Sequence, residues 1–179
     1  MIQAVRAVIP ETMPLLVRIS ATEWMEWTGE ESWDVPQSIQ LAKLLPDLGV
    51  DLLDVSSGGN NAQQKIVIHS YYQVDIAGQI RSALRAEGKS MLIAAVGLIT
   101  TAEMARSIVQ DDGTLAGEKD GMVEVEVGNG QTAKADLVLL ARQLLREPEF
   151  VLRVAHNLGV EVKWPVQYGR AHFPRGVQV

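Results

Sequence analysis

Four short apolar runs, each followed by a helical pattern, restrict the fold more than any other feature of this sequence. The runs cover residues 15–20, 51–55, 91–96 and 137–140. Strands that alternate with helices indicate βαβ units and a parallel sheet. The last run is continuous and bounded by polar residues, which is typical of a strand buried on both faces. The sequence therefore predicts an α/β fold.

Segments with apolar residues at helical spacing follow these strands. They cover residues 36–48, 73–87, 102–109 and 149–158. Asp34 is suited to cap the first of these helices, and Thr100 or Thr101 is suited to cap the third. Glycine, which commonly ends helices, stands at the close of several of them. These glycines are Gly49, Gly88 and Gly159.

The segment Asp111–Lys134 interrupts the regular pattern. It contains the alternating stretch MVEVEV followed by GNG, which predicts an exposed β-hairpin inserted into the fold with its turn at 128–130. The acidic side chains in this stretch are interpreted as a solvated face, not as a metal site. We expect residues 1–179 to form a single domain with this insert and an irregular tail over 160–179.

Composition and charge exclude several classes of function. The formal net charge of -6 and the pI of about 5.1 leave no basic surface for nucleic acid. The chain has no cysteine, which excludes disulfides and thiolate metal sites and favours an intracellular protein. No apolar run approaches the roughly 20 residues that span a bilayer. We expect a soluble, cytoplasmic protein without a membrane, nucleic-acid or metal partner.

Residues suited to bind an anion stand in or directly after the predicted strands. Gly97 follows the third strand, and Ala141 with Arg142 follows the fourth. The run Ser56–Gly59 follows the second and offers backbone N–H groups, although it lacks the ending of a P-loop. Arg18 lies within an apolar strand, where an arginine is costly unless it pairs with an acid or meets an anionic ligand. Ligands of α/β folds bind at this edge of the sheet.

Five stretches of the chain match one known family. They read PLLVRISATEW, GVDLLDVSSGG, AAVGLIT, ADLVLLARQLLREPEF and PVQYGRA. Together they resemble the C-terminal half of the old yellow enzyme family, the NAD(P)H:flavin oxidoreductases, and in particular the class that includes xenobiotic reductases. The likeness covers nearly the whole chain outside the predicted hairpin.

The resemblance implies a TIM-barrel fold, of which this chain would supply a (β/α)4 C-terminal half. A complete (β/α)8 barrel needs about 250 residues. The family's N-terminal half carries the substrate-binding histidine pair and the proton-donating tyrosine, and those motifs do not occur here, so no catalytic residue is assigned. We expect the chain to act as a homo-oligomer or with a missing N-terminal half-barrel. The alternative is a truncated, catalytically inert α/β fragment that retains at most a site for the FMN phosphate.

The resemblance also implies a flavoprotein that binds FMN and passes hydride from NAD(P)H to activated alkenes, an ene-reductase. Arg18 would lie beside the flavin ring, and Gly97, Ala141 and Arg142 would hold the phosphate of FMN. Arg170, in the tail motif, would reach the active site of a neighbouring subunit. Members of the family usually have glycine where this chain has Ala141, a change that preserves the N–H group and is tolerated if φ is negative there.

Overall fold

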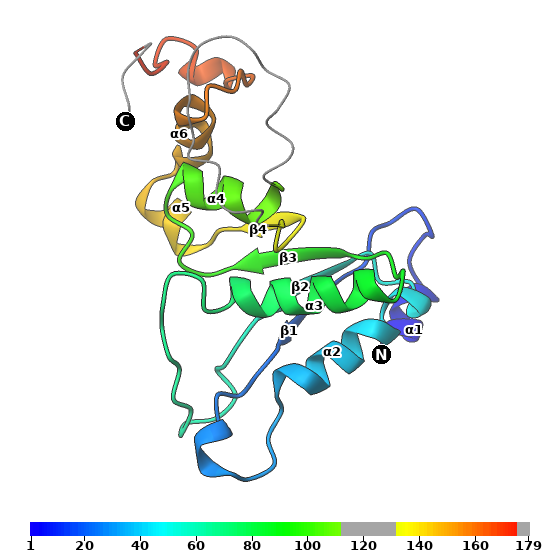
Figure 1. Ribbon diagram of the computed structural model, residues 1–179. Coiled ribbons are helices and arrows are strands. Elements are labelled where there is room, and N and C mark those ends of the chain that lie inside the picture. The colour runs from blue at the N-terminus through cyan, green and yellow to red at the C-terminus, as the bar shows by residue number, and fades with distance from the viewer. Residues whose placement is uncertain (112–131, 175–179) are drawn as a thin grey trace.

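A parallel four-stranded sheet lies at the centre of the computed structural model, which describes residues 1–111 and 132–174. Neighbouring strands follow one another along the chain, in the order β1-β2-β3-β4 (Figure 1). Their bounds are Leu16–Ser20 for β1, Leu52–Ser56 for β2, Leu92–Val96 for β3 and Leu137–Leu139 for β4. The predicted α/β fold with a parallel sheet is confirmed, and the strand bounds differ from the predicted ones only at their ends.

The four predicted helices are present, and two short helices, α1 and α5, occur in addition. The helices are α1 (Ile2–Arg6), α2 (Val35–Leu44), α3 (Val74–Ala86), α4 (Ala102–Val109), α5 (Arg142–Arg146) and α6 (Phe150–Asn157), with single 3-10 turns at Glu26–Thr28, Pro46–Leu48 and Val166–Tyr168. The predicted helix 36–48 is divided because Pro46 has no N–H to continue the hydrogen bonding of α2. The result is a short α-helix followed by a 3-10 turn.

Side chains cap two of the helices as the sequence predicts. The Asp34 carboxylate accepts a hydrogen bond from the Gln37 backbone N–H at 2.9 Å, and the Gln37 side chain accepts one from the Asp34 N–H at 3.1 Å. This reciprocal pair is a capping box. Of the two candidate threonines before α4, Thr101 is the cap, since its hydroxyl accepts from the Met104 N–H at 3.1 Å.

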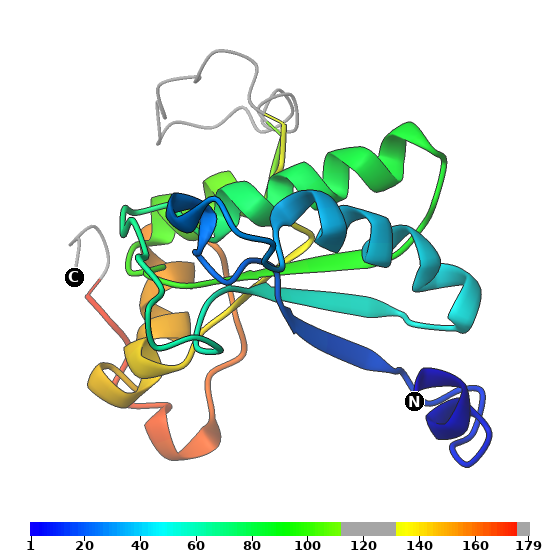
Figure 2. The same cartoon turned by 90° about the horizontal axis from the view of Figure 1, so that it is seen from below.

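One face of the sheet carries the hydrophobic core. Every second strand residue points to this face, and Leu53, Val55, Ile93 and Ala95 are completely buried there. Apolar residues of α2, α3 and α4 complete the same core. Figure 2 shows α2 and α3 side by side over this face. The alternation of each strand thus decides which of its residues meet helices.

The opposite face of the sheet is only partly covered. Leu16 at 58%, Leu92 at 49% and Leu137 at 38% exposure lie on it, and so does Arg18. The prediction that the strand at 137–140 is buried on both faces is wrong. The physical reason is its place in the sheet, because β4 is an edge strand whose outer face has no helix packed on it among the described residues.

The predicted hairpin lies outside the described residues except at its ends. Where the description resumes, the backbone N–H groups of Lys134 and Ala135 both donate to the Ile108 carbonyl, at 2.8 and 3.0 Å. The segment therefore leaves and rejoins the fold beside the end of α4. Over residues 1–111 and 132–174, no helix is both long enough and apolar enough to cross a membrane.

Candidate functional site

A small cavity opens where β3 and β4 end. Its volume is about 120 Å³, and its walls are the segments Val96–Thr100 and Leu139–Gln143 together with Arg146. The structure thus brings together Gly97, Ala141 and Arg142, the three residues that the sequence suggested for one site. They come from opposite sides of the α4 unit and meet because β3 and β4 are neighbours in the sheet.

The backbone turns sharply at the β3 side of this cavity. Gly97 has a φ of 111° and Leu98 a φ of 55°, both in the left-handed half of conformational space. A Cβ atom on Gly97 would stand 2.5 Å from Nε2 of the buried Gln73. Glycine is therefore required at this position for two reasons, its backbone conformation and the close approach of a side chain. A leucine held at positive φ is uncommon and is a feature of functional sites.

The side chain of Gln73 stabilises this turn through hydrogen bonds. Its side-chain NH₂ donates to the Val96 carbonyl at 2.8 Å, and its side-chain oxygen accepts from the Ser57 hydroxyl at 2.9 Å. The amide therefore ties the segment after β2 to the last residue of β3. Because Gln73 is buried and both of its polar ends are bonded, it holds Gly97 in place.

The β4 side of the cavity supplies positive charge. Arg142 and Arg146 stand four positions apart on α5, a spacing that places them on the same side of a helix. They are the only charged side chains that line the cavity, and neither forms an ion pair within the part of the chain that the structure describes. Ala141 has a φ of −125°, so the condition of a negative φ for alanine at this position is met. A cavity of this size and charge suits an anionic group such as a phosphate.

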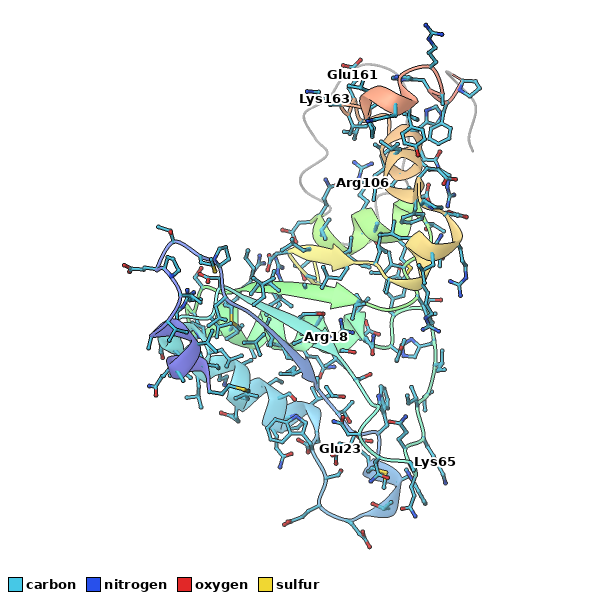
Figure 3. The ribbon with its side chains drawn as sticks, turned by 180° about the vertical axis from the view of Figure 1, so that it is seen from behind. Arg18, Glu23, Lys65, Arg106, Glu161 and Lys163 are labelled. Carbon is cyan, nitrogen blue, oxygen red and sulfur yellow. The ribbon has the colours of Figure 1, made fainter. Side chains whose placement is uncertain are left out.

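Arg18 lies away from this cavity, on the partly exposed face of the sheet (Figure 3). It stands in the middle of β1 and pairs in register with Asp54 on β2. Its Nη1 donates to the Asp54 carboxylate at 2.9 Å, and its Nη2 donates to the Ser56 hydroxyl at 3.3 Å. Arg18 has an acidic partner, as one of the two alternatives from the sequence requires. Its side chain is still 58% exposed, so the other alternative, contact with an anionic ligand, stays open.

Two of the backbone N–H groups that the sequence suggested as donors in the run Ser56–Gly59 are already bonded within the fold. The Gly58 N–H donates to the Thr22 carbonyl at 2.9 Å, and the Gly59 N–H donates to the side chain of Gln64 at 2.7 Å. The hydroxyl of Ser20 also donates to the Gly58 carbonyl, at 2.6 Å. These bonds join the loops after β1 and β2, so the glycines allow close packing between two loops.

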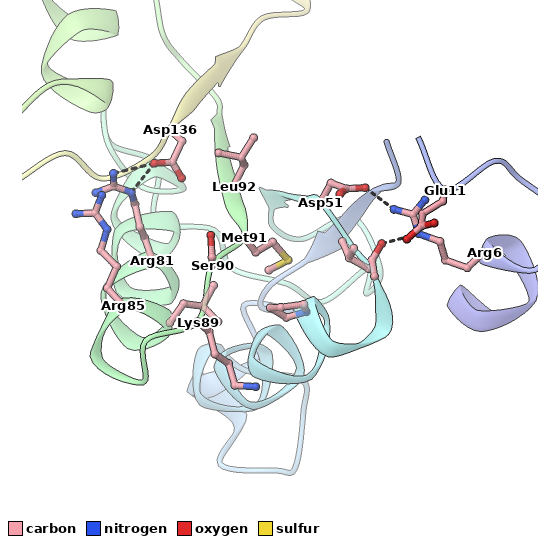
Figure 4. A pocket seen from close by; sticks show the side chains of 14 residues that line it. Arg6, Glu11, Asp51, Arg81, Arg85, Lys89, Ser90, Met91, Leu92 and Asp136 are labelled. Atoms are coloured by element: carbon pink, nitrogen blue, oxygen red, sulfur yellow. Dashed lines mark hydrogen bonds and ion pairs between the residues drawn. The ribbon is translucent and has the colours of Figure 1, made fainter. Parts of the chain in front are cut away.

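Charged groups also gather at the other end of the strands, around a cavity of about 890 Å³. Figure 4 shows Arg81 directed at Asp136 and Arg6 at Asp51. These arginines and acids pair with one another across the starts of the strands. The two ion pairs connect α1 and α3 to the starts of the strands, so we assign these four charged residues a structural role. Arg170 lies elsewhere, exposed in the tail just beyond the 3-10 turn Val166–Tyr168.

Sequence reasoning missed three residues: Gln73 and Arg146 at the strand ends, and Asp54 beside Arg18. The spacing of Arg146 from Arg142 was a usable signal. Gln73 and Asp54 gave no local signal, because their partners lie 16 or more positions away.

The parallel sheet defines an α/β protein, and the cationic cavity at its strand ends is a candidate site for an anionic ligand. Comparison with known proteins narrows this class. An NADH:flavin oxidoreductase of Gibberella zeae is 37% identical over an alignment of 183 positions, which covers 98% of this chain and 38% of that protein. NADPH dehydrogenases of Bacillus velezensis and Bacillus subtilis are 37% and 35% identical over 88% of the chain.

Most of this chain is homologous to oxidoreductases of the old yellow enzyme family, which confirms the resemblance seen in the sequence. The chain spans 38%, 38% and 37% of the lengths of these relatives. No family model matches it.

Proposed function

We propose that this chain forms the C-terminal half of a (β/α)8 barrel, as a (β/α)4 unit with an inserted hairpin. Three features support the proposal. The strands follow one another in the sheet without a reversal of order, as in a barrel and unlike a doubly wound sheet. Among the described residues, the helices that form the core, α2, α3 and α4, pack on one face of the sheet. The other face, with Arg18, is available to line a barrel interior.

On this scaffold we propose an FMN-dependent NAD(P)H oxidoreductase of the ene-reductase type. The observation that carries the proposal is the convergence of Gly97, Ala141 and Arg142 on one cationic cavity, in a chain whose relatives are named for flavin and NAD(P)H chemistry. FMN, when bound, accepts hydride from NAD(P)H and passes it to an activated alkene.

The described residues fit FMN at its phosphate end. A volume of about 120 Å³ is well below the roughly 300–1,000 Å³ of sites that enclose a whole ligand of drug size. The cavity therefore suits the phosphate, held by the guanidinium groups of Arg142 and Arg146. The flavin ring would extend from it over the exposed face of the sheet, where Arg18 offers positive charge.

A second candidate is a chain that binds FMN through its phosphate and has no catalytic activity by itself. The small volume of the cavity favours it, because the described residues enclose only one end of such a ligand. In either case we propose that the chain assembles with a neighbouring subunit or a second half-barrel. The exposed Arg170 would then act on the neighbour's site.

Titration of the purified chain with FMN tests the proposal. We expect saturable binding that Arg142→Ala weakens by at least tenfold, because the loss of a charge-assisted bond to phosphate costs about 1.5–3 kcal/mol. Arg85→Ala is the matched control, since Arg85 is exposed at the opposite end of the strands. Equal affinities of Arg142→Ala and wild type would contradict the assigned phosphate site.

Oxidation of NADPH with 2-cyclohexenone as acceptor separates the two candidates. Alkene-dependent turnover by the FMN-loaded chain supports the ene-reductase. FMN binding without turnover supports the inactive binding unit.

A further inference from the structure

The ion pair between Arg18 and Asp54 is strongly asymmetric in its exposure. The Asp54 side chain is 10% exposed, whereas the Arg18 side chain is 58% exposed. The pair forms because the two residues are register partners on adjacent strands and point to the same face. The acid is therefore enclosed within the sheet surface, and the guanidinium is presented above it.

Asp54 depends on Arg18 for its charge compensation. One carboxylate oxygen accepts the bond from Arg18 at 2.9 Å. The other is buried and has no hydrogen-bond partner within residues 1–111 and 132–174. On the same face, its strand neighbours are Leu52 and Ser56, and Ala94 lies beside it on β3, so these contribute no charge. Burial accordingly raises the pKa of Asp54, and the charge of Arg18 opposes this rise.

Structural stability alone does not call for a buried acid at this position. Removal of a carboxylate from water is costly, and apolar residues in place of a buried ion pair are often as stable or more stable. Leu52, two positions before Asp54 and on the same face of β2, is an apolar side chain that is only 6% exposed, so this face of the strand can bury apolar side chains. The acid does have one clear electrostatic effect, because a negative charge next to the guanidinium reduces the positive potential above the sheet.

We propose that Asp54 is the counter-charge that tunes Arg18, and that it limits how strongly this arginine stabilises the negative charge of reduced FMN. The inference rests on the proposed function, in which the flavin ring lies beside Arg18. Asp54 is then a positioning and tuning residue that acts on the cofactor through Arg18. Its removal favours the reduced form of FMN over the oxidised form.

The test compares Asp54→Asn with wild type in anaerobic titrations of the full chain with oxidised and with reduced FMN. We expect Asp54→Asn to increase the preference for reduced FMN by about tenfold, since one nearby negative charge is lost. That ratio corresponds to a rise of about 30 mV in the two-electron potential of bound FMN. The matched control is Asp47→Asn, which removes the acid of another ion pair, Asp47–Lys89, before β2 and away from the cavity. It should leave the ratio unchanged.

Each outcome decides the proposal. The proposal is overturned if Asp54→Asn leaves the preference for reduced over oxidised FMN unchanged or decreases it. An equal loss of affinity for oxidised and reduced FMN, which a purely structural role predicts, is one such result. Absence of saturable FMN binding by wild type overturns the proposed function and this inference together, so the wild-type arm separates the two failures. Asp54→Ser, which also removes the charge, replaces Asp54→Asn if thermal unfolding shows that the latter is not folded.

Discussion

Single buried interactions connect distant parts of this chain, and Asp136 is the clearest case. Its carboxylate accepts from Arg81 at 2.8 and 3.1 Å and from the Ile93 backbone N–H at 2.8 Å. Arg81 is almost completely buried and also donates to the Ala133 carbonyl at 2.6 Å. One acid therefore holds α3 against the starts of β3 and β4.

Replacement of this acid should destabilise the protein. We expect Asp136→Ala to lower the free energy of unfolding by about 2–4 kcal/mol, because it leaves the buried Arg81 without its partner. Urea unfolding at pH 7 measures the change. Asp47→Ala, at the exposed Asp47–Lys89 pair, is the control and should cost less than about 1 kcal/mol. Similar losses in the two variants would contradict the role of Asp136.

The same acid makes stability depend on pH. Burial acts to raise the pKa of Asp136, but the hydrogen bonds from Arg81 and Ile93 and the nearby arginine charges outweigh it, so the pKa lies below 3.8. Its stabilising effect is therefore fully present above pH 3.8 and is lost as the pH falls through the lowered value. We expect the stability difference between wild type and Asp136→Asn to shrink over that range in urea unfolding. A difference that stays constant there would contradict the assignment.

Gly97 offers a test of the strand-end turn. We expect Gly97→Ala to destabilise the protein by about 1–3 kcal/mol, since the new methyl group meets Gln73 at 2.5 Å and φ is 111°. Thermal unfolding measures the loss. Gly59→Ala is the control, because Gly59 also has a positive φ but open space around its Cβ position. If both variants lose the same stability, close packing by Gln73 is not the cause.

At the scale of elements, several helices and strands of this chain are short, and contacts at their ends contribute to their stability. α4 contains eight residues, and its first turn is satisfied by the Thr101 hydroxyl. β4 contains three residues and has a neighbour on one side only. The loops after β1 and β2 are joined by backbone hydrogen bonds. A helix as short as α4 is marginal by itself, so it depends on tertiary packing and on contacts at its ends.

The side-chain cap of α4 should make a measurable contribution to the free energy of unfolding. We expect Thr101→Ala to lower the free energy of unfolding by about 1 kcal/mol, since one N–H of the first turn loses its acceptor. Thr100→Ala is the matched control in the same thermal unfolding series, because Thr101 and not Thr100 accepts the Met104 N–H. A larger loss for Thr100→Ala would show that the cap is wrongly assigned.

At the scale of the molecule, the sheet has one covered face and one face that is only partly covered. Leu16, Leu52 and Leu92 form a row across three strands, and its two outer members are half exposed. Exposed apolar surface of this kind favours association with other protein surfaces. The arrangement accords with the proposed assembly, in which this face is covered by a second half-barrel or a neighbouring subunit.

A polar residue on this face should reduce association. We expect Leu92→Gln to shift the chain toward smaller species in light scattering over a concentration series. Leu44→Gln is the control, since Leu44 is 59% exposed on α2, outside the sheet. An equal effect of both substitutions would show that general surface polarity, and not this face, governs association.

Over residues 1–111 and 132–174, the sequence by itself determined the positions of the four strands and of the four main helices, and their order. Apolar runs, the Asp34 and Thr101 caps and the glycines at helix ends act over a few residues, so they can be read locally. Once a parallel sheet is inferred, the meeting of Gly97 with Arg142 also follows, because adjacent strands end at the same edge.

Only the tertiary structure decided which charges are paired and which face of the sheet is covered. Arg18 and Asp54 are 36 positions apart, and Arg81 and Asp136 are 55 apart. Their pairing depends on strand register and helix placement, which local patterns do not specify. The same holds for Gly58. The sequence suggested that its N–H group binds a ligand, but in the structure this group donates to the Thr22 carbonyl. Long-range geometry assigns each polar group its partner, and this geometry arises only when the chain is packed.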